Sequence, residues 1–138
     1  NNFDGFSFNN STDIVIQNSI AEDNDNYGYR YFNGSQNIIF DNDIAINNTV
    51  AGFYFDATNI IIRNSISIRN GFGFFFDQNV VNVVVNTSKS SFNDTGVFIN
   101  QFAQFLDFFT TDIINTTVTD LQNNTTTTNF SAASLIQN

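Results

Sequence analysis

A repeat of about 23 residues is the feature that most constrains the fold of this chain. Asparagines recur at spacings of 24, 22, 23, 22 and 23 residues: Asn24, Asn48, Asn70, Asn93, Asn115 and Asn138. Glycines recur at spacings of 23, 24, 21 and 23, each before an apolar-x-apolar pair: Gly5, Gly28, Gly52, Gly73 and Gly96. Further apolar pairs lie ten and eight residues before each of the first four asparagines: Ile14/Ile16, Ile38/Phe40, Ile60/Ile62 and Val83/Val85. Three series with one period indicate that the chain consists of copies of a single unit.

Each unit has the sequence signature of short β-strands. Its runs alternate apolar and polar residues and are rich in Ile, Val, Phe and Tyr, and no helical period is sustained. Gly and Asn separate the runs, at places where we expect a turn or a positive φ. A unit this small buries its apolar face only by stacking on its copies, about 4.8 Å apart. We therefore predict an all-β parallel β-solenoid of about six coils.

The predicted solenoid is one domain that spans residues 1–138 and has an ordered interior. The repeats are clear over 1–115, whereas 116–138 form a degenerate last coil or a tail. Inward positions should form columns of like residues, one of Phe and Tyr and one of Ile and Val. The recurring asparagines should form a hydrogen-bonded column at a corner. A shorter column is predicted for Asn18, Asn42 and Asn64, which Thr87 continues.

The repeats also resemble those of a known class. The stretches "NIIIRNSISIRNGFGFFF" and "QNIIFDNDIAINNTVAGFYF" are similar to the repeats of right-handed parallel β-helix proteins of the pectin-lyase-like superfamily. They are most similar to the Asn- and Ile-rich repeats of adhesin-like surface proteins. The resemblance implies a right-handed β-helix without implying one function. Family members that cleave polysaccharides use clustered Asp, Arg or Lys residues on one outer face, sometimes with Ca²⁺.

Composition excludes several function classes. The chain lacks Cys and His, so disulfides, thiolate nucleophiles, Ser-His triads and imidazole metal ligands are excluded. A net charge of −9 with four basic residues argues against binding to nucleic acid. No apolar run reaches the roughly 18–20 residues of a transmembrane helix, so we expect no membrane insertion. We expect no enzymatic activity and no cofactor. Because the chain begins NNFDG, we expect a processed product or a segment of a longer chain.

Two pairs of carboxylates are the candidates for chemistry. Asp41 and Asp43 flank Asn42 and are expected to point the same way, with Asp41 stacked beside Arg63 in a surface ion pair. Asp56 and Asp77 each follow a repeat glycine by four residues and should stack at one corner. A solvated turn is the favoured interpretation of that corner. A Ca²⁺ site at Asp56 and Asp77 is a weaker alternative, and a glycosidase pair is weaker still.

Two columns of apolar residues are predicted to point out of the solenoid. The first is the middle residue of each apolar triplet: Val15, Ile39, Ile61, Val84 and Leu106. The second follows the repeat glycines: Tyr54, Phe75 and Phe98. Exposed apolar stripes are unusual in a soluble monomer, so these residues are candidates for a partner interface. Alternatively, a loop, the tail or a flattened second core covers them.

Asn-x-Ser/Thr sequons are frequent and make the chain a candidate glycoprotein. They start at Asn9, Asn10, Asn33, Asn47, Asn86, Asn93, Asn115, Asn123, Asn124 and Asn129. The alternative explanation is the high content of Asn, Ser and Thr together with turn chemistry.

An open solenoid has two exposed edges that favour strand addition, and no amphipathic cap is evident at either end of this sequence. The leading hypothesis is a structural extracellular or cell-surface protein. Its copies would stack end to end, with lateral contacts as a further option, into a glycosylated filament, sheath or surface layer. The alternatives are a stalk segment of an adhesin and a β-helix module that binds or cleaves carbohydrate.

Overall fold

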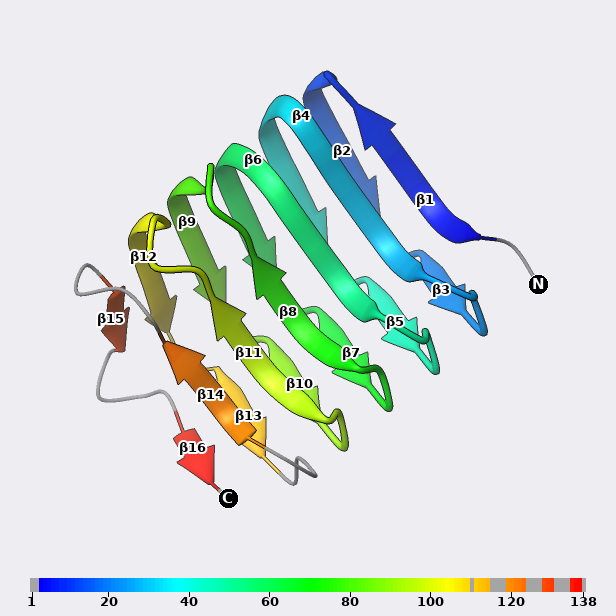
Figure 1. The fold of residues 1–138 in the computed structure, drawn as a ribbon, viewed down its shortest axis with the longest axis vertical. Helices are drawn as coiled ribbons and strands as arrows, with labels where there is room; N and C mark the ends of the chain where they lie inside the picture. Colours follow the sequence, from blue (N-terminus) through cyan, green and yellow to red (C-terminus); the bar gives the residue numbers. More distant parts are fainter. Residues whose placement is uncertain (1–2, 110, 115–118, 124–127, 131–134, 138) are drawn as a thin grey trace.

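The structure is a parallel β-solenoid in which each coil stacks on the previous one (Figure 1). It is a computed structural model that describes residues 3–109, 111–114, 119–123, 128–130 and 135–137. No helix occurs in these ranges. The solenoid makes about five turns, slightly fewer than the six expected, and three short strands form its last rung. The predicted fold class is confirmed.

Within the described ranges, sixteen strands build the rungs. The first rung contains β1 (Asp4–Asn9), β2 (Thr12–Gln17) and β3 (Ile20–Glu22). The second contains β4 (Tyr27–Asp41) and β5 (Ile44–Ile46), and the third contains β6 (Ala51–Arg63) and β7 (Ile66–Ile68). The fourth contains β8 (Phe72–Phe76), β9 (Val81–Asn86) and β10 (Lys89–Ser91). The fifth contains β11 (Thr95–Ile99), β12 (Gln104–Phe109) and β13 (Asp112–Ile114). The last contains β14 (Thr119–Asn123), β15 (Thr128–Phe130) and β16 (Leu135–Gln137).

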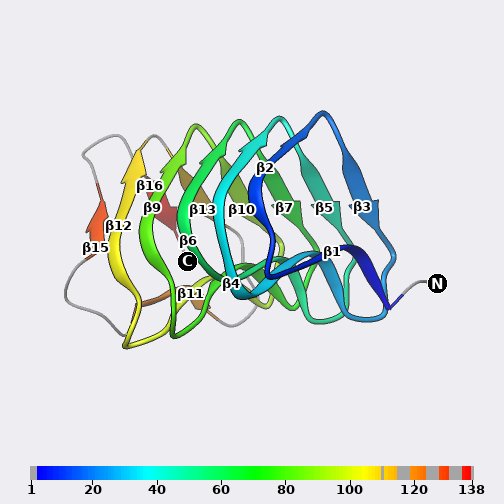
Figure 2. The ribbon, with the colours of Figure 1, turned by 90° about the horizontal axis from the view of Figure 1, so that it is seen from above.

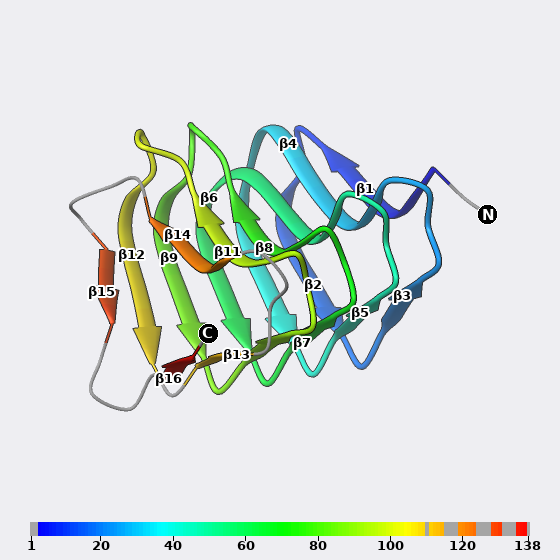
Figure 3. The same cartoon turned by 60° about the horizontal axis from the view of Figure 1, so that its bottom comes forward.

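The strands form three faces that run along the solenoid. Strands β4 and β6 bend at a corner, so each contributes to two faces, whereas the other long runs break into two strands there. The aromatic face consists of β1, β8, β11, β14 and the first halves of β4 and β6. The groove face consists of β2, β9, β12, β15 and the second halves of β4 and β6 (Figure 2). The short-strand face consists of β3, β5, β7, β10, β13 and β16 (Figure 3).

The core is the stack of inward side chains that the alternation predicts. Tyr29, Phe53 and Phe74 are fully buried, with neighbouring rings stacked at centroid distances of 4.8 and 5.0 Å. Phe40 meets the edges of this column at 5.4 Å from Tyr29 and from Phe53. Stacked and edge-on rings are the favoured aromatic arrangements, so each ring adds contact energy to its burial. The columns of Phe, Tyr, Ile and Val are confirmed.

The repeat glycines lie inside strands, which differs from the expected turn or positive φ. A Cβ atom added to Gly28 would lie 2.7 Å from the carbonyl oxygen of Gly52 and 2.8 Å from Nδ2 of Asn48. The glycine is required because the next coil approaches too closely for a side chain. Among the described glycines, Gly34 has the positive φ, at 80°.

Asparagines make the turns and fasten the coils together. Asn18, Asn42 and Asn64 take φ values of 52°, 62° and 53°, a region that Asn tolerates better than most residues. At another corner the predicted buried column is present from Asn24 to Asn93, because Nδ2 of each asparagine donates to Oδ1 of the next. The distances are 2.7 Å for Asn24 to Asn48, 2.9 Å for Asn48 to Asn70 and 3.2 Å for Asn70 to Asn93. The last two predicted members, Asn115 and Asn138, lie outside the described residues.

Candidate functional site

An exposed aliphatic row runs along the groove face. Val15, Ile39, Ile61 and Val84 are neighbours in register on successive strands and point away from the core. Val15 is 57% exposed and Ile61 is 41% exposed, while Ile39 and Val84 are half-buried. The predicted outward placement of these four residues is correct.

Leu106 was wrongly assigned to this row. It is fully buried and pairs in register with Val83, whereas Asp107 occupies the outward position beside Val84. The error is a register slip of one residue, and a slip of one residue in a strand exchanges the inward and outward faces. The carboxylate of Asp107 therefore ends the aliphatic row.

The row forms the floor of a groove. One hollow of about 340 Å³ lies over Val15, Ile39 and Ile61. A second, of about 370 Å³, lies over Ile61 and Val84 and reaches Asp107. Both hollows are lined by Asn59 and Ile61, so they continue into one another along the solenoid axis. We call this feature the aliphatic groove.

One wall of the aliphatic groove is a column of polar side chains that the sequence analysis missed. Asn37 donates to Asp13 at 2.9 Å, Asn59 donates to Asn37 at 3.1 Å, and Asn82 donates to Asn59 at 3.1 Å. All four residues have φ between 56° and 60°. Each of the four residues directly precedes an inward apolar residue, and they recur at spacings of 24, 22 and 23. This repeat is the sequence signal from which the column could have been predicted.

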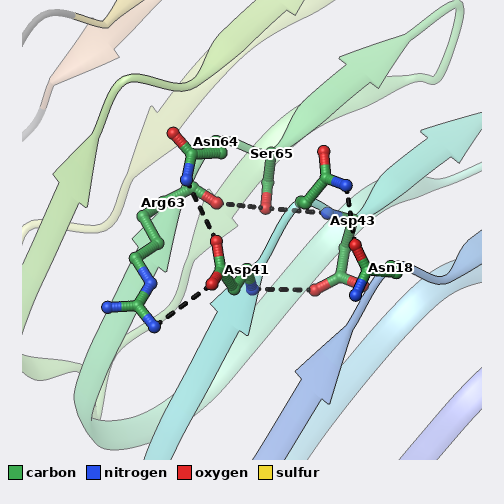
Figure 4. A network of polar contacts seen from close by, with 7 residues as sticks. Asn18, Asp41, Asp43, Arg63, Asn64 and Ser65 are labelled. Atoms are coloured by element: carbon green, nitrogen blue, oxygen red, sulfur yellow. Dashed lines mark hydrogen bonds and ion pairs between the residues drawn. The ribbon is translucent and has the colours of Figure 1, made fainter.

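The strand ends beside the groove carry a second polar network (Figure 4). Arg63 and Asp41 form the predicted ion pair, with an N–O distance of 3.2 Å. Asn64 donates to the same carboxylate at 3.0 Å, and Asn42 donates to Asn18 at 2.8 Å. The predicted column of Asn18, Asn42 and Asn64 is thus partial, because Asn64 bonds to Asp41 instead of Asn42.

Asp43 does not point the same way as Asp41. Its side chain is fully buried, because Asn42 turns the chain between them with a positive φ. The carboxylate accepts hydrogen bonds from the backbone N–H of Ser19 at 2.9 Å, from the Ser19 hydroxyl at 2.6 Å and from the N–H of Asp41 at 3.0 Å. Three donors offset the cost of burying this carboxylate, which acts as a fastener between two coils.

Asp56 and Asp77 lie at one corner on neighbouring coils, directly after the paired residues Phe55 and Phe76. Asn79 donates to Asp56 at 2.6 Å. The Tyr54 hydroxyl donates to Asp77 at 2.7 Å, and burial followed by this hydrogen bond raises the pKa of Tyr54. No group of three or more acidic residues that could hold a metal occurs within the described ranges. The hydrogen bonds of Asp56 and Asp77 are those of a polar turn. A solvated turn was the interpretation that the sequence favoured for this corner.

A comparison with protein families decides what kind of protein this is. A model of the right-handed β-helix region matches residues 1–118. The chain belongs to the right-handed β-helix family. No curated protein and no solved structure matches this β-helix. In the described part of the chain, no helix is long and apolar enough to cross a membrane.

The second predicted outward column of the β-helix is a row of aromatic rings in contact with one another. Tyr54, Phe75 and Phe98 stack on successive coils at centroid distances of 5.3 and 4.5 Å. Phe72 meets Phe75 edge-on at 4.9 Å. All four side chains are half-buried. A partner interface at Tyr54, Phe75 and Phe98 stays a prediction.

The sequons of the β-helix differ in access. The exposed ones are Asn9, Asn10, Asn33, Asn47 and Asn86. Asn93 is fully buried, and its Nδ2 donates to the Ser67 carbonyl and to the Ser90 hydroxyl, so it is corrected from a glycosylation candidate to a structural residue. Asn123 and Asn129 lie in β14 and β15, whereas Asn115 and Asn124 lie outside the described residues.

The short-strand face of the β-helix carries an apolar patch that the sequence analysis did not identify. Ala45 and Ser67, at the centres of β5 and β7, point inward and are fully buried. The residues on either side of them point outward and are half-buried: Ile44, Ile46, Ile66 and Ile68. The available signal was the small central residue in Ile-Ala-Ile and Ile-Ser-Ile, because a small side chain fits against the repeat glycine of the next strand.

Proposed function

We propose that this β-helix is a structural extracellular protein whose copies stack end to end into a glycosylated filament, sheath or surface layer. The observation that carries the proposal is the in-register stacking of like coils, in which each rung is a template for a further one. Phe6 and Phe8 are half-buried in the first rung, while their neighbours in register, Tyr29 and Tyr31, are fully buried. A further coil placed on this rung would bury both rings.

The polar groups of the same rung favour addition of a coil. In the buried asparagine column, Oδ1 of Asn48 accepts from the backbone N–H and from Nδ2 of Asn24. An asparagine at the matching position of a preceding coil would donate to Oδ1 of Asn24 in the geometry that the column already repeats. Such an edge is a template for strand addition.

The side chains of the β-helix favour a scaffold over an enzyme. The carboxylates of Asp41, Asp43, Asp56 and Asp77 accept hydrogen bonds from neighbouring donors, and these bonds link successive coils. Exposed sequons such as Asn33 and Asn47 offer positions for glycans on the outer surface. Intact-mass measurement of native material tests this part, since unmodified chains would contradict it.

Electron microscopy and sedimentation velocity of the purified chain at rising concentration test the stacking. We expect rods that lengthen with concentration. A Phe8→Asp variant, which puts a charge on the open end, should stay monomeric. A Phe102→Asp variant, changed at a side chain that is 58% exposed on a turn, is the matched control and should still form rods. Circular dichroism checks that both variants fold. Dispersed monomers of the unmodified chain at high concentration would contradict the proposal and favour a stalk segment of an adhesin.

A further inference from the structure

We propose that Asn33 is a site of spontaneous covalent modification, at which the side-chain amide is lost as ammonia and an Asp or isoaspartyl residue takes its place. The chain contains two Asn-Gly pairs, Asn33-Gly34 and Asn70-Gly71. The fold leaves the first pair open to this reaction and closes the second pair to it. This reactivity is a property of one coil and does not depend on the proposed assembly.

The reaction is an intramolecular attack on the side-chain carbonyl of the asparagine. The backbone nitrogen of the following residue loses its proton and bonds to Cγ, and the bond between Cγ and Nδ2 breaks. Nδ2 takes up that proton and leaves as ammonia, so that a cyclic succinimide remains. Water then opens the ring at either of its carbonyl carbons, which gives Asp or isoaspartate. A following glycine favours the attack, because no Cβ atom hinders the approach of its nitrogen.

Asn33 and Gly34 lie in a bulge at the bend of β4, where the strand passes from the aromatic face to the groove face (Figure 1). Tyr31 pairs with Phe55 and Ser35 with Ala57, which leaves residues 32–34 of β4 beside residue 56 of β6. The extra residues of a bulge are not part of the regular pairing between strands. The backbone of this pair can therefore move without separating two coils.

The surroundings of Asn33 leave room for the attack. Gly34 has a φ of 80°, and a Cβ atom added to it would meet no described atom within 4 Å. The Asn33 side chain is exposed, and its Nδ2 donates to Oδ1 of Asn9 at 2.9 Å. An exposed hydrogen bond costs little to break, because water replaces the lost partner. The Asn33 side chain can therefore rotate toward the Gly34 nitrogen in the folded protein, with water at hand.

The same dipeptide is protected at Asn70-Gly71. Asn70 is buried, and its amide bonds to Asn48 and to Asn93 on the neighbouring coils. The backbone nitrogen of Gly71, which would have to attack, donates to the Asn48 carbonyl at 3.4 Å. A Cβ atom added to Gly71 would lie 2.6 Å from the carbonyl oxygen of Val50, so the backbone has no room to shift. Reaction at Asn70 therefore requires this corner to open first.

The modification changes the outer surface of the second coil. Nδ2 of Asn33 is a donor to Asn9, whereas the new carboxylate is an acceptor, so this link between the first two coils is lost. Each event also adds a negative charge to a chain whose net charge is −9. Asn33 begins a sequon, and a glycan would occupy the same Nδ2. A copy of the chain therefore carries a glycan or the modification at this residue, never both.

Peptide mapping by mass spectrometry tests the proposal, because trypsin separates the two pairs. Cleavage after Arg30, Arg63, Arg69 and Lys89 gives fragments 31–63 and 70–89, each with one Asn-Gly pair. The folded chain, produced without glycans, is incubated in mildly alkaline buffer below the pH at which its tyrosines ionise. A second sample is incubated in urea until both fragments have reacted, and a sample digested without incubation gives the background.

We expect the folded chain to convert its amide to an acid at Asn33, which tandem spectra locate. The reaction at Asn33 should be at least about tenfold faster than at Asn70, because only the fraction of molecules with an open corner reacts at Asn70. In urea we expect both residues to react. If Asn33 reacts in urea and stays unchanged in the folded chain, the fold protects this site and the proposal is overturned. Equal rates at Asn33 and Asn70 in the folded chain also overturn it.

Asn33→Gln is the matched control variant, since the longer side chain would have to close a larger ring. Circular dichroism verifies that the variant folds. Ion-exchange chromatography of the folded unmodified chain should show an acidic form that accumulates with time. We expect this form to be absent or much slower to appear in the variant. If the acidic form accumulates equally fast in both chains, another residue is its source and the proposal is overturned.

Discussion

The side-chain amide of Asn70 is bonded to the coils on both sides of its own. Its Oδ1 accepts from the backbone N–H of Asn48 at 2.8 Å and from the Asn48 side chain at 2.9 Å. Its Nδ2 donates to the Ala45 carbonyl at 3.1 Å and to Oδ1 of Asn93 at 3.2 Å. Asn59, by contrast, makes its column on the exposed wall of the groove. The same residue type is therefore structural at both positions, with very different access to water.

Replacing Asn70 with Asp tests this difference. The change turns the donating Nδ2 into an acceptor that faces the Ala45 carbonyl and Oδ1 of Asn93, in a buried corner. We expect the free energy of unfolding to fall by about 3 kcal/mol or more, because buried acceptors lose their donor and a charge is buried. Chemical denaturation measures the loss. Asn59→Asp, at an exposed position, is the control and should cost less than about 1 kcal/mol. Equal losses would contradict the assigned roles.

Strands are the scale at which the sequence predicts this molecule best. Alternation and the repeat locate the inward pairs Ile38/Phe40 and Ile60/Ile62, because residues buried on one face leave a period of two. The prediction fails at Leu106, where a shift of one residue in the assumed period exchanges inside and outside. The groove is only partly predictable from the sequence. The alternation predicts its aliphatic floor, but it does not show the column of hydrogen-bonded side chains that forms its wall.

The repeat glycines show why other features were not predictable. Gly28 belongs to a strand, and the reason for it is the carbonyl oxygen of Gly52 on the next coil. Sequence reasoning evaluates a glycine by its own φ, so it attributed these residues to turns. The short-strand face was missed for a related reason, because Ala45 and Ser67 are inward without being large and apolar.

Gly28→Ala tests the close approach of strand β4 to its neighbour. The added methyl group would lie 2.7 Å from a backbone oxygen, which can move only if the strands separate. We expect a loss of about 1–3 kcal/mol in unfolding free energy, the usual cost of overpacking. Gly34→Asn is the matched control, since no atom lies within 4 Å of an added Cβ and Asn tolerates a positive φ. If the two variants unfold at the same denaturant concentration, the close approach is not what requires glycine.

The whole molecule is a stack in which every coil is held by its neighbours. The ionisation of its tyrosines depends on whether that stack is folded. The pKa values of Tyr29 and Tyr31 are raised, with burial as the largest cause. Those of Tyr54 and Tyr27 are raised as well, again mainly by burial. These are all four tyrosines of the chain, so ionising any of them opposes the folded state.

Alkaline titration is therefore expected to unfold the protein. A tyrosine ionises at about pH 10 in the unfolded chain and at a higher pH in the folded one. The stabilisation from keeping these phenols neutral is complete below about pH 10, and it is lost as the pH rises above that value toward the folded pKa values. Tyrosinate absorbance and circular dichroism should change together above pH 10. Tyr31→Phe removes a phenol whose hydroxyl has no hydrogen-bond partner among the described residues, so this variant should stay folded to a higher pH. If tyrosinate appears near pH 10 without loss of β-structure, the phenols are exposed to water in the folded protein, and the prediction is wrong.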